Sequence, residues 1–272
     1  MLAADLVWPL HGAATGAFAL EDEMAAPEQA VVTAVERPVL LGYAPEKPNG
    51  RAMLILGGGG YTALMAGREG VQVARWLTAL GYHAFVLIHR FPHAGTGPSA
   101  PLDDALAAMA MIRASGHGDA GVGVVGLSSG GHLASCLIAD YPAAWGGAQP
   151  QRPDLLVIGY APISTNAKGR TIIADKPPLP PVEKQALYDA LQPDAQLLPD
   201  PPPAFIVYAG NDPVVPVTNA HRLHDALKGA GASPELHIFA DAPHGFALDT
   251  PDQPVSLWPR LCEAWLRQVG FL

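Results

Sequence analysis

A glycine-flanked serine is the residue in this chain whose setting most clearly indicates chemistry. Residues 126–130 read G-L-S-S-G, with Ser128 at the centre. A strand-like apolar run precedes it and a helical pattern follows, and such an elbow exposes a hydroxyl on a sharp, strained turn. The flanking glycines remove side chains that would clash there. We therefore predict that Ser128 is a nucleophile, against the alternative of a tight turn that merely needs small residues.

A serine hydroxyl needs an adjacent base to attack at neutral pH, and His244 is the histidine best placed to be that base. Enzymes with this elbow carry their groups in the order serine, acid, histidine. His244 follows the last apolar run, in a loop of the kind that carries active sites at the carboxyl ends of parallel strands. His132, four residues after Ser128, is expected to pack beside the elbow. The order is wrong for His83, His89 and His93, which precede the serine.

Asp212 is the predicted acid that orients His244. It stands in G-N-D-P-V-V-P, residues 210–216, directly after the apolar run 205–209. Its expected role is to accept the Nδ1–H of the imidazole and to stabilise the imidazolium. Asp241 and Asp249 lie nearer to His244 in sequence and are rivals, although Asp241 is better explained as a residue that shapes its turn.

Acyl transfer places negative charge on a carbonyl oxygen, and backbone N–H groups must already point at that position. The N–H of Ser129, after the nucleophile, is one predicted donor. The glycine run 57–60 follows another strand-like segment, so Gly58 and Gly59 are predicted to supply the others.

The glycine run also has a competing interpretation. Residues 58–63 match G-x-G-x-x-A, a dinucleotide-binding pattern that expects an acidic residue at the end of the next strand. That strand ends instead in I-H-R, residues 88–90. We therefore expect no nucleotide cofactor.

Alternating apolar runs and helical patterns must position these groups. Strands are expected at residues 38–43, 53–56, 83–88, 121–127, 155–160, 205–209 and 235–239. Helices are expected at 68–80, 102–112, 130–139, 217–229 and 257–269. This alternation predicts an α/β fold with a mostly parallel, doubly wound sheet and helices on both faces, in one domain over residues 1–272. Residues 1–37 are expected to be irregular.

A proline-rich stretch, residues 164–203, interrupts the alternation. Forty residues without clear strands inside a compact domain usually form a lid or a binding loop. A short helix is expected within it near residues 183–191.

Composition excludes several classes of function. Apolar residues make up 49% of the chain and charged residues 15%, enough for a large core and against disorder. The net charge is −9 without a basic cluster, so no nucleic-acid partner is expected. There is neither a membrane-length apolar run nor a Cys/His cluster for zinc. Cys136 and Cys262 are expected to be buried free thiols, with their pairing left open.

The amino-terminal segment has no basic region followed by an apolar run. We therefore expect a cytoplasmic protein, or a periplasmic or secreted one if a signal peptide was removed. The expected partner is a small molecule, and the oligomeric state is left open.

Several segments together resemble bacterial esterases related to acetylxylan esterases, which have the α/β-hydrolase fold. These segments are GGGGY (57–61), REGVQVARWLTALGYHAFVLIHR (68–90), APLDDALAAMAMIRA (100–114), GVVGLSSGGHLAS (123–135), AGNDPVVP (209–216), ELHIFADAPHGF (235–246) and CEAWLRQVG (262–270). The resemblance implies cofactor-free hydrolysis of short acyl esters, such as acetyl groups on sugars or xylan fragments. It carries the triad onto Ser128, Asp212 and His244, and the oxyanion donors onto Gly58, Gly59 and Ser129.

The chain departs from this family at two positions in the site. Gly57 stands where the family commonly has proline or histidine, and Ser129 stands where it often has alanine. Neither change removes a backbone donor. A peptidase of the same fold, or an inactive binding module, remains an alternative, because serine peptidases share this chemistry.

Overall fold

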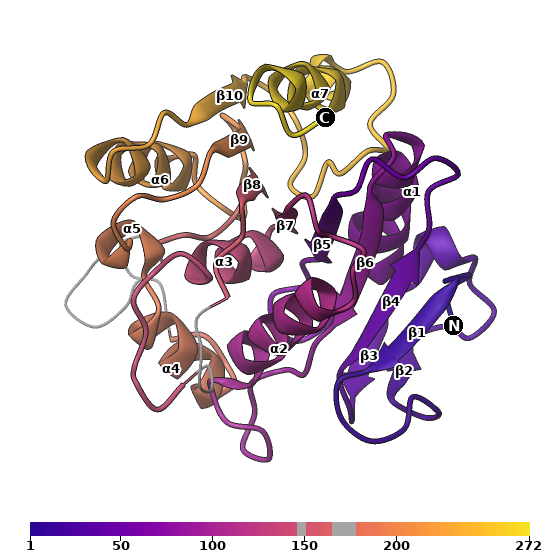
Figure 1. Ribbon diagram of the computed structural model, residues 1–272. Coiled ribbons are helices and arrows are strands. Elements are labelled where there is room, and N and C mark those ends of the chain that lie inside the picture. The colour runs from indigo at the N-terminus through magenta and orange to yellow at the C-terminus, as the bar shows by residue number, and fades with distance from the viewer. Residues whose placement is uncertain (146–150, 165–177) are drawn as a thin grey trace.

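An eight-stranded sheet forms the centre of the molecule in the computed structural model, which describes residues 1–145, 151–164 and 178–272 (Figure 1). The strand order across the sheet is β1-β4-β6-β5-β7-β8-β9-β10. The strands span Leu6–Pro9 (β1), Val39–Tyr43 (β4), Ala52–Leu56 (β5), His83–Ile88 (β6), Val122–Leu127 (β7), Leu155–Gly159 (β8), Ala204–Ala209 (β9) and Glu235–Phe239 (β10).

Six of these strands, from β6 to β10 in the sheet order, run parallel to one another. The strands β4 and β1 complete the other edge in antiparallel pairing. Every residue of β4, β5, β7, β8 and β9 is buried. Burial on both faces explains why these strands read as continuous apolar runs instead of alternating ones.

Helices cover both faces of the sheet (Figure 1). Their bounds are Gln72–Ala79 (α1), Ala100–Ala114 (α2), Ser129–Cys136 (α3), Val182–Ala190 (α4), Pro193–Gln196 (α5), Thr218–Gly229 (α6) and Trp258–Gln268 (α7). The helices α1 and α7 lie on one face, where Trp76 and Trp258 pack edge to face with ring centroids 5.3 Å apart. The helices α2, α3 and α6 lie on the other. This layered arrangement is the α/β-hydrolase fold, as predicted.

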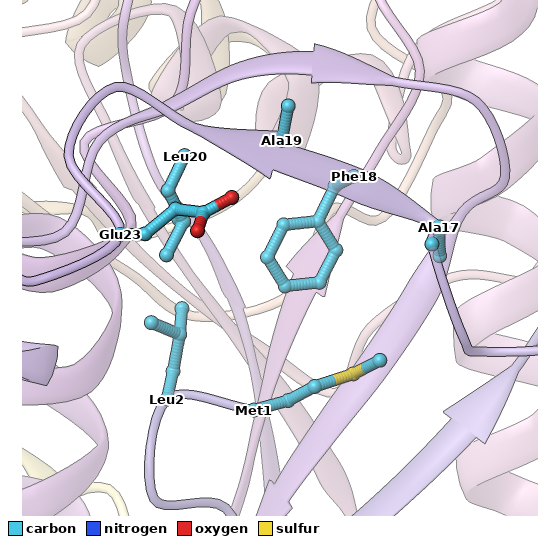
Figure 2. Close-up of a pocket in the computed structure, with 8 residues that line it drawn as sticks. Met1, Leu2, Ala17, Phe18, Ala19, Leu20 and Glu23 are labelled. Atoms are coloured by element: carbon cyan, nitrogen blue, oxygen red, sulfur yellow. The ribbon is translucent and has the colours of Figure 1, made fainter.

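The amino-terminal segment is more ordered than expected, and the prediction that residues 1–37 are irregular was wrong. Besides β1, it contains a two-stranded ribbon of β2 (Phe18–Leu20) and β3 (Val32–Val35). These strands have only three or four residues, too few for an alternating pattern to emerge from the sequence. Beside the ribbon lies a hollow lined mainly by apolar side chains, where Phe18 and Leu20 lie across from Met1 and Leu2 (Figure 2).

The helix expected at residues 68–80 begins as a wider, π-helical turn over Ala66–Val71 and continues as α1. Such turns are rare and often occur at functional sites.

The short helix expected near residues 183–191 is confirmed as α4. Residues 165–177 of the proposed lid lie outside the described residues. Within the described ranges, no helix has the length and apolar character to span a membrane.

Candidate active site

Ser128 stands at the junction of β7 and α3, in a backbone conformation that side chains rarely adopt. Its φ is 52° and its ψ is −125°. The turn is so tight that a Cβ atom at Gly130 would lie 1.9 Å from the carbonyl oxygen of Leu56. Only glycine fits there, which is the physical basis of the pattern in the sequence.

The three residues predicted to act together form one chain of hydrogen bonds. The Ser128 hydroxyl lies 3.0 Å from His244 Nε2, and His244 Nδ1 lies 2.7 Å from Asp212 Oδ2. A carboxylate can only accept, so Nδ1 carries the proton and Nε2 is the free acceptor for the serine proton. The side chain of His244 is 20% exposed and that of Asp212 is fully buried. An imidazole in this arrangement can take the serine proton.

Asp212 is held as a carboxylate. Burial disfavours its charged form, but the hydrogen bond from His244 and those from the Val215 and Val214 N–H groups outweigh burial and lower its pKa. Its rivals are engaged elsewhere. Asp241 accepts a hydrogen bond from Asn211, and Asp249 pairs with an arginine.

The glycine run lies against the elbow, and its N–H groups have different partners. Gly58 donates to Glu69 Oε2 at 2.6 Å, and Gly60 donates to Ser129 Oγ at 2.9 Å. The N–H groups of Gly59 and Ser129 have no hydrogen-bond partner among the residues that the structure describes. Unpaired N–H groups beside a nucleophile suit a developing oxyanion.

Gly58 therefore differs from the expectation that its N–H faces the reacting oxygen. The structure gives that N–H to a buried carboxylate instead. We retain Gly59 and Ser129 as the predicted donors, with Gly58 as the residue that anchors the loop.

Two residues near the site were not predicted from the sequence: Glu69 and Tyr160. Glu69 is 4% exposed, and its Oε1 accepts a 3.0 Å hydrogen bond from the Tyr160 hydroxyl. The Tyr160 ring packs edge-on against the ring of His244, with centroids 5.3 Å apart. The sequence held one signal for Tyr160, which directly follows a buried strand. It held none for Glu69, which lies within a helical pattern.

His132, four residues after Ser128 in α3, contacts Tyr61, the residue that follows the glycine run. It is fully buried and lies 2.8 Å from the Tyr61 hydroxyl. On its other side it contacts the carbonyl of Leu191, just after α4. His132 thereby connects the segment around α4 to the loop 57–61, which carries the predicted oxyanion donor Gly59 and is called the oxyanion loop below. The Tyr188 ring of α4 also packs against the ring of Tyr61.

Neither cysteine forms a hydrogen bond with Ser128, His244 or Asp212 in the described structure. Cys136 and Cys262 are buried free thiols, and burial raises the pKa of both. In the part of the chain that the structure describes, no group of three or more histidine, cysteine or acidic side chains is arranged to hold a metal ion.

Comparisons with known proteins show which families the chain is similar to. The sequence profile of the prolyl oligopeptidase family matches residues 95–269. An acetylxylan esterase of Xylanibacter ruminicola is 30% identical over 224 residues, which cover 76% of this chain and 43% of that protein. An endo-1,4-beta-xylanase B of Butyrivibrio fibrisolvens is 28% identical over 72% of this chain and 32% of its own. The chain thus spans less than half the length of these curated relatives.

Solved structures of ester hydrolases resemble this chain over nearly its whole length. An acetyl ester-xyloside bifunctional hydrolase of Caldicellulosiruptor lactoaceticus is 28% identical with a TM-score of 0.72, covering 98% of this chain and 97% of that one. The carboxylesterase Cest-2923 of Lactobacillus plantarum has a TM-score of 0.71 at 20% identity, covering 94% and 98%, and supports the fold. The predicted relationship to acetylxylan esterases is confirmed.

Proposed function

The chain belongs to the prolyl oligopeptidase family, and from this premise we propose that it is a serine carboxylesterase for short acyl esters. Acetyl esters of sugars, such as those on xylan fragments, are the proposed substrates. The relative named acetylxylan esterase and the neighbour named acetyl ester-xyloside hydrolase support this choice.

One observation carries the proposal. The Ser128 hydroxyl, the His244 ring and the Asp212 carboxylate form a continuous hydrogen-bonded chain beside the N–H groups of Gly59 and Ser129. A base aimed at a hydroxyl and donors aimed at an oxyanion are the two requirements of acyl transfer.

The proposed mechanism has two steps. His244 Nε2 takes the proton of Ser128 while the serine oxygen attacks the ester carbonyl, and Gly59 and Ser129 stabilise the oxyanion. Nε2–H then protonates the leaving alcohol, which departs from the acyl-enzyme. Water, deprotonated by the same nitrogen, attacks the acyl-enzyme, and the acid leaves as Nε2–H returns the proton to the Ser128 oxygen. Asp212 keeps the imidazole in the required tautomer throughout.

The decisive test is Ser128→Ala with a short p-nitrophenyl ester. We expect kcat to fall by about 10³-fold or more, because the nucleophile is lost while the fold is retained. Labelling of the wild type with a fluorophosphonate, and its absence in Ser128→Ala, would locate the nucleophile independently of any substrate. Undiminished ester hydrolysis by Ser128→Ala would refute the assignment.

The substrate class needs a separate measurement. Rates with acetyl, butyryl and longer esters, beside acetylated xylo-oligosaccharides, would rank the acyl length and the alcohol. Faster release of acetate than of longer acids would support the proposed class. A preference for long acyl chains would contradict it.

A peptidase is the second candidate, because the matching family is named for prolyl oligopeptidase. Peptide p-nitroanilides test it directly, since cleavage of an amide faster than of the matched ester would favour this activity. An inactive binding module is a third, and failure of Ser128 to react with the fluorophosphonate would support it.

A further inference from the structure

Glu69 is a buried carboxylate that the catalytic steps above do not use. It lies in the π-helical turn Ala66–Val71 and is 4% exposed. Burying a charged carboxylate is costly unless hydrogen bonds replace the lost water. Desolvation raises the pKa of Glu69, and the bonds from Gly58 and Tyr160 oppose that rise. The chain thus retains, beside the site, a group whose burial is costly.

On one side Glu69 holds the oxyanion loop. Its Oε2 accepts the Gly58 N–H at 2.6 Å, a charge-assisted bond. Gly58 is also packed so tightly that a Cβ atom there would lie 2.6 Å from both Glu69 Oε2 and Ser128 Cβ. Two residues further, the Gly60 N–H is held by Ser129 Oγ. Gly59 therefore lies between two anchored neighbours, and their anchors set the direction of its N–H.

On the other side the same carboxylate reaches the loop that carries His244, residues 240–249, which we call the histidine loop. Tyr160 donates its hydroxyl proton to Glu69 Oε1, and the hydroxyl oxygen accepts the Ala247 N–H at 3.3 Å. A Cβ atom at Gly245, next to the histidine, would lie 3.7 Å from Glu69 Oε1.

The residue before Glu69 strengthens this second connection. Arg68 donates to the Gly245 carbonyl at 3.2 Å and forms a two-point ion pair with Asp249. One turn of chain therefore contacts both of the loops that must act together.

We propose that Glu69 is a positioning residue that joins the oxyanion loop to the histidine loop and so sets the distance between the donors and the base. This inference rests on the proposed function, since it assigns a role within that site. Glu69 forms no hydrogen bond with Ser128 or His244 in the described structure, so it acts through Gly58 and Tyr160.

The test uses Glu69→Ala and Glu69→Gln, with Glu263→Gln as the matched control. Glu263 lies in α7, accepts an N–H from Trp76 of α1 and forms no hydrogen bond with the site residues in the described structure. Removing one oxyanion donor costs other enzymes about 10²- to 10³-fold in kcat, and we expect about 10²-fold for Glu69→Ala. For Glu69→Gln we expect about 10-fold, since its amide oxygen can still accept the Gly58 N–H without the charge. KM should change little, and Glu263→Gln should match the wild type.

The rate of Ser128 labelling by a fluorophosphonate should fall in parallel with kcat, because phosphonylation also uses the oxyanion hole. Thermal unfolding of each variant, with assays well below its midpoint, separates positioning from loss of fold. Wild-type kcat and labelling rates in folded Glu69→Ala would overturn the proposal.

Two measures keep the outcomes distinct. If neither Glu69 variant folds, Tyr160→Phe is the deciding variant, because it removes only the hydrogen bonds toward the histidine loop. A lower kcat at unchanged KM would support the proposal, and a wild-type kcat would refute it. If the wild type labels but cleaves no ester, the proposed function fails, while the labelling rates of the variants still test Glu69.

Discussion

The hydroxyl of Ser129 accepts the backbone N–H of Gly60 at 2.9 Å. The residue after the nucleophile thus contributes twice, since its own N–H is a predicted oxyanion donor and its side chain holds the loop that carries Gly59. The family that this chain resembles often has alanine here, which could provide the first contribution but not the second.

Ser129→Ala should therefore lower kcat while leaving KM nearly unchanged. Losing one hydrogen bond worth about 0.5–1.5 kcal/mol corresponds to about a 2- to 10-fold fall in rate if the bond serves the transition state. Steady-state kinetics on a short ester measure this. Ser135→Ala is the control, because Ser135 lies in the same helix and, among the described residues, its hydroxyl bonds only to the Gly131 carbonyl. Equal kcat values for the two variants would contradict the role of the side chain.

Asp212→Asn should be far more damaging, although it changes few atoms. The amide of asparagine can donate a hydrogen bond to Nδ1 of His244 and so stabilise the tautomer in which Nε2 carries the proton. A protonated Nε2 cannot accept the proton of Ser128. We expect kcat/KM to fall by about 10³-fold or more at neutral pH, by analogy with the same change in other serine hydrolases. Asp241→Asn tests the rival carboxylate in the same assay and should remain close to wild type. A reversed order of the two effects would reassign the acid.

His132 should make stability depend on pH. Its Nε2 lies 2.9 Å from the Leu191 carbonyl, which can only accept, so Nδ1 is the acceptor for the Tyr61 hydroxyl. Burial lowers the pKa of His132 to about 4, against 6.5 as the reference value. Because the folded pKa is the lower one, protons favour the unfolded chain. The contribution of neutral His132 to the free energy of unfolding is complete above pH 6.5 and is lost as the pH falls toward 4.

The expected loss between pH 7 and pH 5 is about 2 kcal/mol in the free energy of unfolding. Denaturant unfolding of the wild type and of His132→Gln at both pH values measures it, since the difference between the proteins removes the contributions of other histidines. The wild type should lose more stability than the variant on acidification. Parallel pH profiles would show that His132 is not the source.

Much of the site could be predicted because its groups directly follow apolar strands. Ser128 comes after β7, Asp212 after β9 and His244 after β10. The carboxyl ends of parallel strands meet at one edge of a sheet, so residues far apart in sequence are brought near one another by the fold class alone. The short amino-terminal strands were missed because their pairing, and not their pattern, defines them.

By itself, the sequence determined the parallel α/β sheet with helices on both faces, the elbow around Ser128 and the chain order of its partners, because local periodicity and turn chemistry encode these features. Only the tertiary structure decided which N–H groups of the glycine run remain unpaired. That outcome depends on Glu69 meeting Gly58, 11 residues away, and Tyr160, 91 residues away. Such contacts arise where separate elements pack together, and a single acidic residue in a helical pattern carries no local signal of what it will contact.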